Sequence, residues 1–285
     1  MTERQVFVSG HWVAEAQAKV SVFDRAFLMA DGIYEVVAVI GGRLIDFDRH
    51  IARLQRSAEA LQLRNPYSAE QWLHLCREAV TRNQLNEGLI YWQVSRGVAD
   101  RDFVWPELAE PGVVMFTQAK SFPRDLDDTA GLRILTQPDQ RWGRCDIKTI
   151  QLLYSSWAKM IARQAGKDDA WLVDAQGWVT EGTSSNAFIV QDGCILTRQL
   201  SADILPGVTR AAAVQCAQEL GLKLLEQPFT RNQAQAAQEA FVTSATQFVM
   251  PVTEIDGQKV GPGVAGPVTR RLRHLYLQVA LNHAT

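Results

Sequence analysis

Apolar and polar residues alternate in short runs along much of this chain, and turns containing glycine separate the runs. Alternation of this kind predicts β-strands. In the first ~117 residues, strands are expected in VFVSGHWV, in the β-branched run Ile33–Ile40, in LIYWQVS and in VVMFTQ. Later runs (LRILTQ, AWLVD, WVTEG, NAFIV, CILT, FVTSA and PVTEID) predict further strands, most of them joined by tight turns.

Helical periodicity interrupts the strands at five places. Apolar residues lie on one face of a helix predicted from about Asp48, at Ile51, Leu54, Ala58 and Leu61. A second helix is expected to start at Ser68, because Ser68-x-x-Gln71 forms a capping box. Three more are predicted over residues 149–166, from near Gly207, and at the C-terminus.

Strands joined mainly by hairpins, with helices between them, predict an α+β fold of two domains. Residues 119–130 are polar, contain Pro123 and lack an apolar period, which is typical of a linker. We therefore expect a smaller N-terminal α+β domain over 1–118, an interdomain linker over 119–130, and a larger C-terminal domain over 131–285.

Charge and composition narrow the functional classes. The chain has 29 basic and 31 acidic residues and a net charge of −2, with no basic run, so neither nucleic acid nor an anionic membrane is an expected partner. No signal pattern or membrane-spanning apolar stretch is present, and a soluble, cytoplasmic protein is expected. The four cysteines are scattered and the five histidines form no ligand pair, so neither disulfides nor a metal site is predicted.

Among seven lysines, Lys148 stands out because Ile147 precedes it and Thr149-Ile150 follow it. A lysine partly withdrawn from water has a lowered pKa, and its neutral amine can attack a carbonyl carbon. The alternative from position alone is a lysine at a helix start that extends its amine into solvent. A literal Gly261-x-Gly263-x-x-Gly266 motif contains Pro262 and lacks room for a βαβ unit, so a turn is expected there.

Three motifs in order, RCDIKTIQLL, VTEGTSSN and ILPGVTR, resemble those of the fold-type IV aminotransferases, which depend on pyridoxal 5′-phosphate (PLP). The resemblance extends from DRAFLMADGIYEVV to FVTSATQ and is strongest to D-amino-acid aminotransferases. It implies a PLP-binding C-terminal domain, with the cofactor between the two domains, and transfer of an amino group from a D-amino acid such as D-alanine or D-glutamate to a 2-oxo acid.

The same resemblance implies a role for each matching residue. Lys148 would form the Schiff base with PLP and move the substrate proton. Glu181 would face the pyridine nitrogen, and Leu205 would pack against the ring. The phosphate would be bound by Arg53, Gly207, Val208, Thr209, Ser244 and Ala245. Ala245 stands where relatives often carry a hydroxyl, so that contact falls to the backbone or to Thr246. Taken alone, LPGVTR also fits simple capping of a helix. Taken alone, Arg53 and Glu181 each also fit a charge exposed to solvent.

On the substrate side, relatives bind the carboxylate with a tyrosine, an arginine and a histidine two residues further on. Tyr34 and Arg101 match the first two, whereas Phe103 occupies the histidine position. In the family this loop reaches the partner subunit's site, so a homodimer is implied. Phenylalanine cannot donate a hydrogen bond, which leaves an (R)-selective amine transaminase as an alternative. A branched-chain L-aminotransferase, an aminodeoxychorismate-type lyase and a non-catalytic scaffold on this fold rank lower.

Overall fold

The computed structural model describes residues 3–123, 126 and 131–285. The contacts between residues divide the chain into two compact units. The first unit runs to Phe122 and also takes in Ile147–Gln151 and His283–Thr285, and the second unit holds the rest of the described chain. Of the linker expected at 119–130, residues 124–125 and 127–130 lie outside the described residues.

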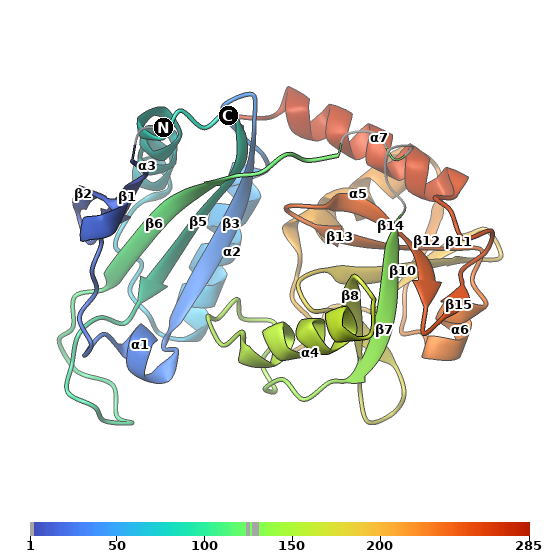
Figure 1. Ribbon diagram of the computed structural model, residues 1–285, viewed down its shortest axis with the longest axis horizontal. Helices are drawn as coiled ribbons and strands as arrows, with labels where there is room; N and C mark the ends of the chain where they lie inside the picture. The colour runs from blue at the N-terminus through green and yellow to red at the C-terminus, as the bar shows by residue number, and fades with distance from the viewer. Residues whose placement is uncertain (1–2, 124–125, 127–130) are drawn as a thin grey trace. The chain divides into compact units, whose positions relative to one another are not determined.

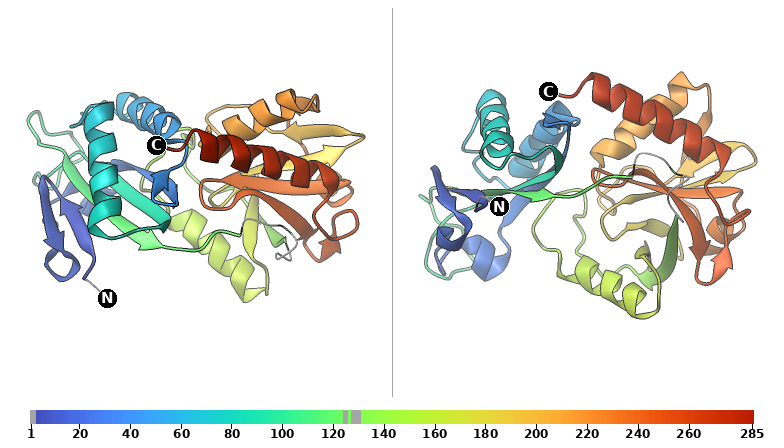
Figure 2. Two further views of the ribbon diagram at one scale, coloured as in Figure 1. Left: turned by 90° about the horizontal axis from the view of Figure 1, so that it is seen from above. Right: turned by 45° about the horizontal axis from the view of Figure 1, so that its top comes forward.

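The first unit is an antiparallel sheet with its two longer helices on one face (Figure 1). Its strand order is β2-β1-β6-β5-β3-β4. The strands are β1 Gln5–Val8, β2 His11–Ala14, β3 Gly32–Ile40, β4 Arg43–Leu44, β5 Glu87–Ser95 and β6 Gly112–Ala119. The helices are the 3₁₀ turn η1 Glu15–Gln17, α1 Arg25–Met29, α2 Phe47–Ala60 and α3 Ala69–Arg82. Figure 2 shows α2 and α3 together on the same face.

Two features predicted from the sequence set up this unit. The capping box is present, since the Ser68 hydroxyl accepts from the N–H of Gln71 and the Gln71 side chain accepts from the N–H of Ser68. Strand β3 forms over the predicted β-branched run, and burial alternates along its first part: Ile33, Glu35 and Val37 are buried, whereas Tyr34 and Val36 are half-buried. Successive side chains therefore point to opposite faces of the sheet.

The second unit is built on a mixed sheet. In the described chain its nine strands run in the order β12-β11-β10-β13-β14-β7-β8-β9, with β15 paired to β14. The strands are β7 Leu132–Pro138, β8 Asp169–Val173, β9 Val179–Gly182, β10 Asn186–Gln191, β11 Cys194–Thr197, β12 Lys223–Glu226, β13 Glu239–Ser244, β14 Phe248–Ile255 and β15 Gln258–Lys259. The helices are α4 Leu153–Gln164, α5 Val208–Glu219, α6 Arg231–Gln235 and α7 Pro267–Asn282.

Helices α5 and α7 pack on each other and against β13 and β14, whereas α4 packs against β7 and β8. A separate core cluster, which includes Ala234 of α6, contains Trp171, Phe229 and Ile255, all fully buried. Two sheets, with helices between strands in sequence, confirm the predicted α+β fold class. Gly261 and Gly263 lie in a turn with φ of 50° and 75°, as expected of that motif.

The helix predicted over 149–166 begins only at Leu153, and that part of the prediction is wrong. Residues 147–151 form a bent, non-helical segment instead, which hydrogen-bonds to the start of β3. The N–H of Tyr34 donates to the Lys148 carbonyl at 3.0 Å, and the N–H of Ile150 donates to the Gly32 carbonyl at 3.1 Å. Hydrogen bonds to a strand far away in the sequence thus replace the first helical turn that the local sequence favours.

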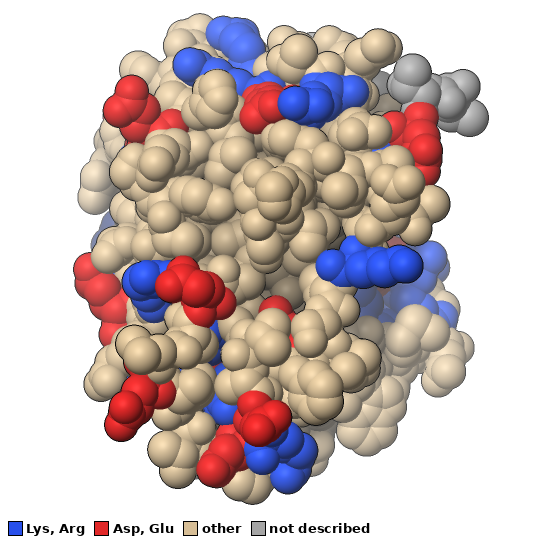
Figure 3. Space-filling model, turned by 90° about the vertical axis from the view of Figure 1, so that its left-hand side faces the viewer, with Lys and Arg blue, Asp and Glu red and all other residues tan. Residues whose placement is uncertain are grey.

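On the face drawn in Figure 3, acidic and basic side chains are interspersed around a broad area without charge, so that face has no continuous basic patch. None of the described helices combines the length and apolarity that a membrane crossing requires. Among the described residues, no group of three or more His, Cys, Asp or Glu side chains is arranged to hold a metal ion. Cys76, Cys145, Cys194 and Cys216 are all buried free thiols.

Candidate active site

The backbone turns sharply at Lys148, because the Thr149 N–H donates to the Ile147 carbonyl at 2.8 Å. Ile147 and Thr149, on either side of the lysine, are buried, with 4% and 6% of their surface exposed. The Lys148 N–H donates to the Ser57 hydroxyl on α2 at 3.2 Å, which fixes the backbone at this point.

The Lys148 amine is half-buried and lies against an aromatic ring. Its Nζ is 4.0 Å from the centroid of the Tyr34 ring. Within the part of the chain that the structure describes, no carboxylate lies within 4.0 Å of Nζ. The Tyr34 ring thus holds the amine in position. Because no carboxylate binds the amine, its nitrogen stays available for covalent chemistry. Tyr34 stacks in turn on Tyr91, and Tyr91 on Phe116, at 5.5 and 4.9 Å between centroids.

A buried ion cluster lies on the other face of β3. Glu35 Oε1 and Oε2 accept from Arg53 Nε and Nη2 at 2.8 and 2.7 Å, and Glu35 Oε2 also lies 2.7 Å from His50 Nδ1. All three side chains are at least 95% buried. Burial alone raises the pKa of Glu35, but the charge and hydrogen bonds of Arg53, with those of His50, outweigh it and lower that pKa to about 2.

From the sequence alone, Arg53 also fits a solvated charge on a helix. The structure excludes that alternative, because only 4% of Arg53 is exposed. Sequence reasoning missed Glu35 and His50. The available signal for Glu35 was its charge at an inward-facing position of the apolar run IYEVVAVI. The signal for His50 was its i, i+3 spacing from Arg53 on one helix.

In the second unit, Glu181 lies at the end of β9 and is surrounded by hydrogen-bond donors. Arg141 Nη1 donates to Oε1 at 2.5 Å, and Asn186 Nδ2 donates to Oε2 at 2.9 Å. The Leu205 N–H lies 3.1 and 3.2 Å from the two oxygens. A protonated carboxyl would need an acceptor for its own hydrogen, and none of these three groups is one. Burial raises the pKa of Glu181, and Arg141 opposes that rise.

Arg141 is itself held by a second carboxylate. Its Nε and Nη2 donate to the two oxygens of Asp139 at 3.0 and 2.7 Å, and Thr180 Oγ1 donates to Asp139 Oδ2 at 2.7 Å. The Asp139–Arg141 pair therefore fixes the guanidinium that meets Glu181. Sequence reasoning did not find Arg141, because a charged loop of sequence DQRWGR gives no sign of which arginine turns inward.

Helix α5 begins with an open anion-binding end. Its N-cap, Gly207, makes no side-chain cap, and the first intrahelical bond runs from Ala211 to the Gly207 carbonyl. The N–H groups of Val208 and Thr209 thus have no acceptor within the helix, and the helix dipole adds partial positive charge there. Such an end suits a phosphate group.

Two buried hydroxyl groups of this unit lack a hydrogen-bond partner in the described chain. They are Thr243 Oγ1 and Ser185 Oγ. Thr243 is paired with Asn186 across strands β13 and β10. The Ser244 hydroxyl accepts from the Gln247 N–H at 3.2 Å, so it shapes the turn that also contains Ala245. Leu205 and Ala245 are half-buried.

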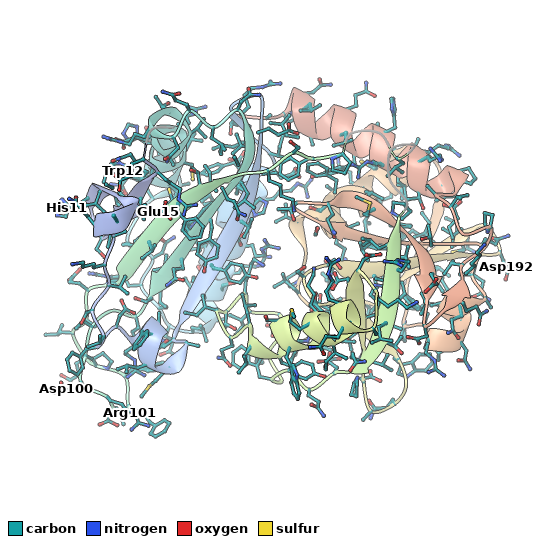
Figure 4. All side chains as sticks on the ribbon, viewed as in Figure 1. His11, Trp12, Glu15, Asp100, Arg101 and Asp192 are labelled. Carbon is teal, nitrogen blue, oxygen red and sulfur yellow. The ribbon has the colours of Figure 1, made fainter. Side chains whose placement is uncertain are left out.

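Arg101 and Phe103 lie together on an exposed loop after β5. The Arg101 guanidinium is 5.5 Å from the centroid of the Phe103 ring, and 80% of Phe103 is exposed. Figure 4 shows Arg101 and Asp100 at the tip of this loop, at the edge of the first unit. In the described chain no contact joins this pair to Tyr34 or Lys148, which form a pair of their own.

Comparison with known proteins gives consistent matches. A model of the amino-transferase class IV family matches residues 32–255. A D-alanine aminotransferase of Staphylococcus aureus (strain MSSA476) is 37% identical over 284 residues, covering 98% of this chain and 99% of the relative. A D-alanine aminotransferase of Bacillus licheniformis is 36% identical and covers 94% of each chain.

A solved structure agrees on the fold. The branched-chain amino acid aminotransferase of the archaeon Thermoproteus uzoniensis, solved with norvaline, superposes with a TM-score of 0.87 at 28% identity, covering 98% of this chain and 95% of that one. A second branched-chain amino acid aminotransferase, solved with pyridoxamine 5′-phosphate, has a TM-score of 0.89 at 28% identity and covers 99% of this chain and 95% of its own.

Proposed function

Since the chain belongs to the class IV aminotransferases, a PLP-dependent enzyme family, we propose that it transfers the amino group of a D-amino acid, such as D-alanine or D-glutamate, to a 2-oxo acid. The observation that carries the proposal is the Lys148 amine, held 4.0 Å above the Tyr34 ring with no carboxylate partner among the described residues. The D-alanine aminotransferase relatives, matched over nearly their full length, support the D-amino acid as donor.

The residues present suit PLP. Glu181 is ringed by donors that favour its anionic form, which a protonated pyridine nitrogen requires. The start of α5 at Gly207, Val208 and Thr209 offers uncapped N–H groups to a phosphate. The unpartnered hydroxyl of Thr243 lies beside the turn of Ser244 and Ala245. In this proposal Arg53 also binds the phosphate, and Leu205 contacts the ring.

When bound, PLP supplies an aldehyde carbon for the amine and a ring that withdraws electrons. The chain's own residues do the rest. Lys148 Nζ would take the proton from the substrate Cα and hold it for the return step. Glu181 would keep a proton on the ring nitrogen, and Arg141, held in place by Asp139, favours the anionic form of Glu181. Tyr34 orients Nζ through its ring.

For the substrate carboxylate we propose Arg101 and Tyr34. An arginine binds a carboxylate through two parallel hydrogen bonds. One observation favours a second candidate function, an (R)-selective amine transaminase: Phe103 adds an exposed apolar ring beside Arg101 and no hydrogen-bond donor. Donors with an apolar group in place of the carboxylate would suit that ring.

A homodimer is part of the proposal, because each unit exposes large apolar side chains. On α4 these are Leu153, Trp157 and Met160, spaced i, i+4 and i+7 and 85%, 58% and 53% exposed. In the first unit, Phe27 and Leu108 are 69% and 96% exposed. Exposed apolar side chains at helical spacing are typical of an interface.

Treating the purified protein with PLP, then with borohydride and a protease, tests the site. We expect mass spectrometry to find the reduced cofactor on Lys148. Lys148→Ala should abolish labelling and turnover, whereas Lys159→Ala, a lysine on α4 3.5 Å from Asp169, should keep both. Labelling of another lysine with full activity in Lys148→Ala would refute the assignment.

The donor is tested by half-reactions with D-alanine, D-glutamate, L-leucine and (R)-1-phenylethylamine, followed by loss of the visible band of the bound cofactor. We expect D-alanine or D-glutamate to react fastest. A faster reaction with (R)-1-phenylethylamine establishes the second candidate, and a response to L-leucine alone contradicts both.

A further inference from the structure

The loop that joins β5 to β6, residues 96–111, carries Arg101 and Phe103. Sixteen residues without regular structure are long for a connection and lose much conformational freedom when ordered. Its tip is open, since Phe103, Val104 and Leu108 are 80%, 73% and 96% exposed. Packing of these side chains within the chain therefore does not hold the loop.

A nearly buried carboxylate anchors it instead. Asp31 Oδ2 accepts from Arg25 Nε at 2.7 Å and from Arg96 Nε at 2.9 Å. The side chains of Asp31, Arg25 and Arg96 are 11%, 3% and 9% exposed. A carboxylate between two guanidiniums in such a site stabilises both, because each arginine would otherwise be buried near a like charge.

Each arginine then reaches the loop with another part of its guanidinium. Arg25 Nη1 donates at 2.7 Å to the carbonyl of Asp102, the residue between Arg101 and Phe103. Arg96 lies 4.0 Å from the centroid of the Trp105 ring, two residues beyond Phe103. The loop is thus held at residue 102, between Arg101 and Phe103, and at residue 105, two residues beyond Phe103, by two arginines that both bind Asp31.

Arg96 is also fixed at its other end. Its Nη1 and Nη2 donate to the carbonyls of Gln62 and Leu61, just after α2, at 3.1 and 2.9 Å. The start of the loop is pinned by backbone bonds from Arg25 N to Gly97 O at 2.9 Å and from Ala99 N to Phe23 O at 3.2 Å. The backbone bonds therefore hold the loop as far as residue 99, and the contacts made by Arg25 and Arg96, both bound to Asp31, hold it as far as residue 105.

We propose that Asp31, acting through Arg25 and Arg96, is a positioning residue that fixes the Arg101–Phe103 loop and so sets the affinity for donors that carry a carboxylate. This rests on the proposed aminotransferase function, in which Arg101 meets that carboxylate. Asp31 touches neither substrate nor cofactor in this scheme, so its loss changes substrate binding more than the chemical step.

Asp31→Asn removes the charge with little change of shape. We expect KM for D-alanine to rise about tenfold or more, with kcat within about threefold of the parent and unchanged affinity for PLP. Hydrogen–deuterium exchange of the holoenzyme should become faster over residues 100–106. The matched control is Arg64→Gln, which removes the exposed ion pair between Arg64 and Glu110 near the end of the same loop and should leave KM unchanged.

Trp105→Leu is the second variant, because it leaves the Asp31 cluster intact and removes only the stacking on Arg96. A smaller rise in KM, about threefold, is expected there. Two results for Asp31→Asn overturn the proposal: unchanged exchange over 100–106, or a fall in kcat with no change of KM for D-alanine. If Asp31→Asn does not fold, an unchanged KM in Trp105→Leu overturns it.

The exchange measurement separates this proposal from the proposed function. If the parent protein does not react with D-alanine, the function fails, while faster exchange in Asp31→Asn would still establish that Asp31 holds the loop. If the parent reacts and exchange does not change, the loop proposal alone fails.

Discussion

The amide oxygen of Asn186 approaches Gly207 so closely that a Cβ on this glycine would lie 2.1 Å from it. The Asn186 amide nitrogen donates both to Glu181 Oε2 and to the Leu205 carbonyl, each at 2.9 Å. One side chain thus links the carboxylate proposed for the pyridine nitrogen to the helix start proposed for the phosphate. The spacing of these two cofactor contacts depends on Asn186.

Gly207→Ala should therefore weaken PLP binding about tenfold or more, because the new methyl group displaces the Asn186 amide or the start of α5. Absorbance titration of the apoprotein with PLP measures the dissociation constant. Gly143→Ala is the control, since a Cβ there meets nothing within 4 Å. Equal affinities in the two variants would contradict the role of the close approach.

Arg141→Gln should make turnover more sensitive to acid. Burial raises the pKa of Glu181 and Arg141 opposes that rise, so loss of the guanidinium leaves Glu181 protonated up to a higher pH. A protonated Glu181 no longer favours a proton on the ring nitrogen. We expect kcat to fall about tenfold or more at pH 6, and the loss to shrink towards pH 9.

The pH profile of kcat from about pH 5.5 to 9.5 checks this prediction. Arg144→Gln is the matched control, because Arg144 lies three residues away, is half exposed and pairs only with Asp146 among the described residues. A uniform loss of kcat at every pH in Arg141→Gln would show that Arg141 acts on structure and not on the charge of Glu181.

Glu35→Gln tests the buried cluster through stability. The pKa of Glu35 falls from its ordinary value of 4.5 to about 2 on folding, which corresponds to about 3 kcal/mol of unfolding free energy. A lowered carboxyl pKa stabilises the fold above pH 4.5, and that contribution is lost as the pH falls through 4.5 towards 2. The variant should be less stable by about 3 kcal/mol at pH 7, with the difference shrinking towards pH 3.

Urea unfolding of parent and variant at pH 7, 5 and 3 measures these differences. Glu59→Gln replaces an exposed carboxylate on α2 and should change stability by less than about 0.5 kcal/mol at each pH. A gap between parent and Glu35→Gln that stays constant down to pH 3 would contradict the lowered pKa.

Phe103→His should favour donors with a carboxylate. The imidazole restores a hydrogen-bond donor worth about 1–2 kcal/mol, or roughly 5- to 30-fold in kcat/KM for D-alanine. Arg64→His, which removes only the exposed ion pair with Glu110 near the end of the same loop, is the control and should change nothing. If both variants behave alike, Phe103 does not take part in carboxylate binding.

The parts of the fold fixed by local chemistry were predictable from the sequence. The capping box at Ser68, the β-branched strand over Ile33–Ile40 and the helix start at Gly207 each follow from residues within one short segment. The motif around Glu181 likewise placed the carboxylate at a strand end. Its neighbours in space, Arg141 above all, come from distant positions and could not be read from spacing.

Lys148 shows where local prediction ends. Thr149 and the residues after it have a helical pattern, yet the backbone of 147–151 pairs with β3, more than one hundred residues earlier in the chain. The sequence marked Lys148 as unusual through its apolar neighbours. The segment around Lys148 is not helical because it has a long-range hydrogen-bonding partner, and periodicity carries no information about such partners.

Because five residues around Lys148 belong to the first unit while the chain on both sides of them belongs to the second, the two halves are interdependent. A fragment starting after Phe122 would retain the lysine in its sequence but lose the strand and the serine to which its backbone is hydrogen-bonded. Any truncation that separates the halves therefore removes the surroundings of the amine proposed to hold the cofactor.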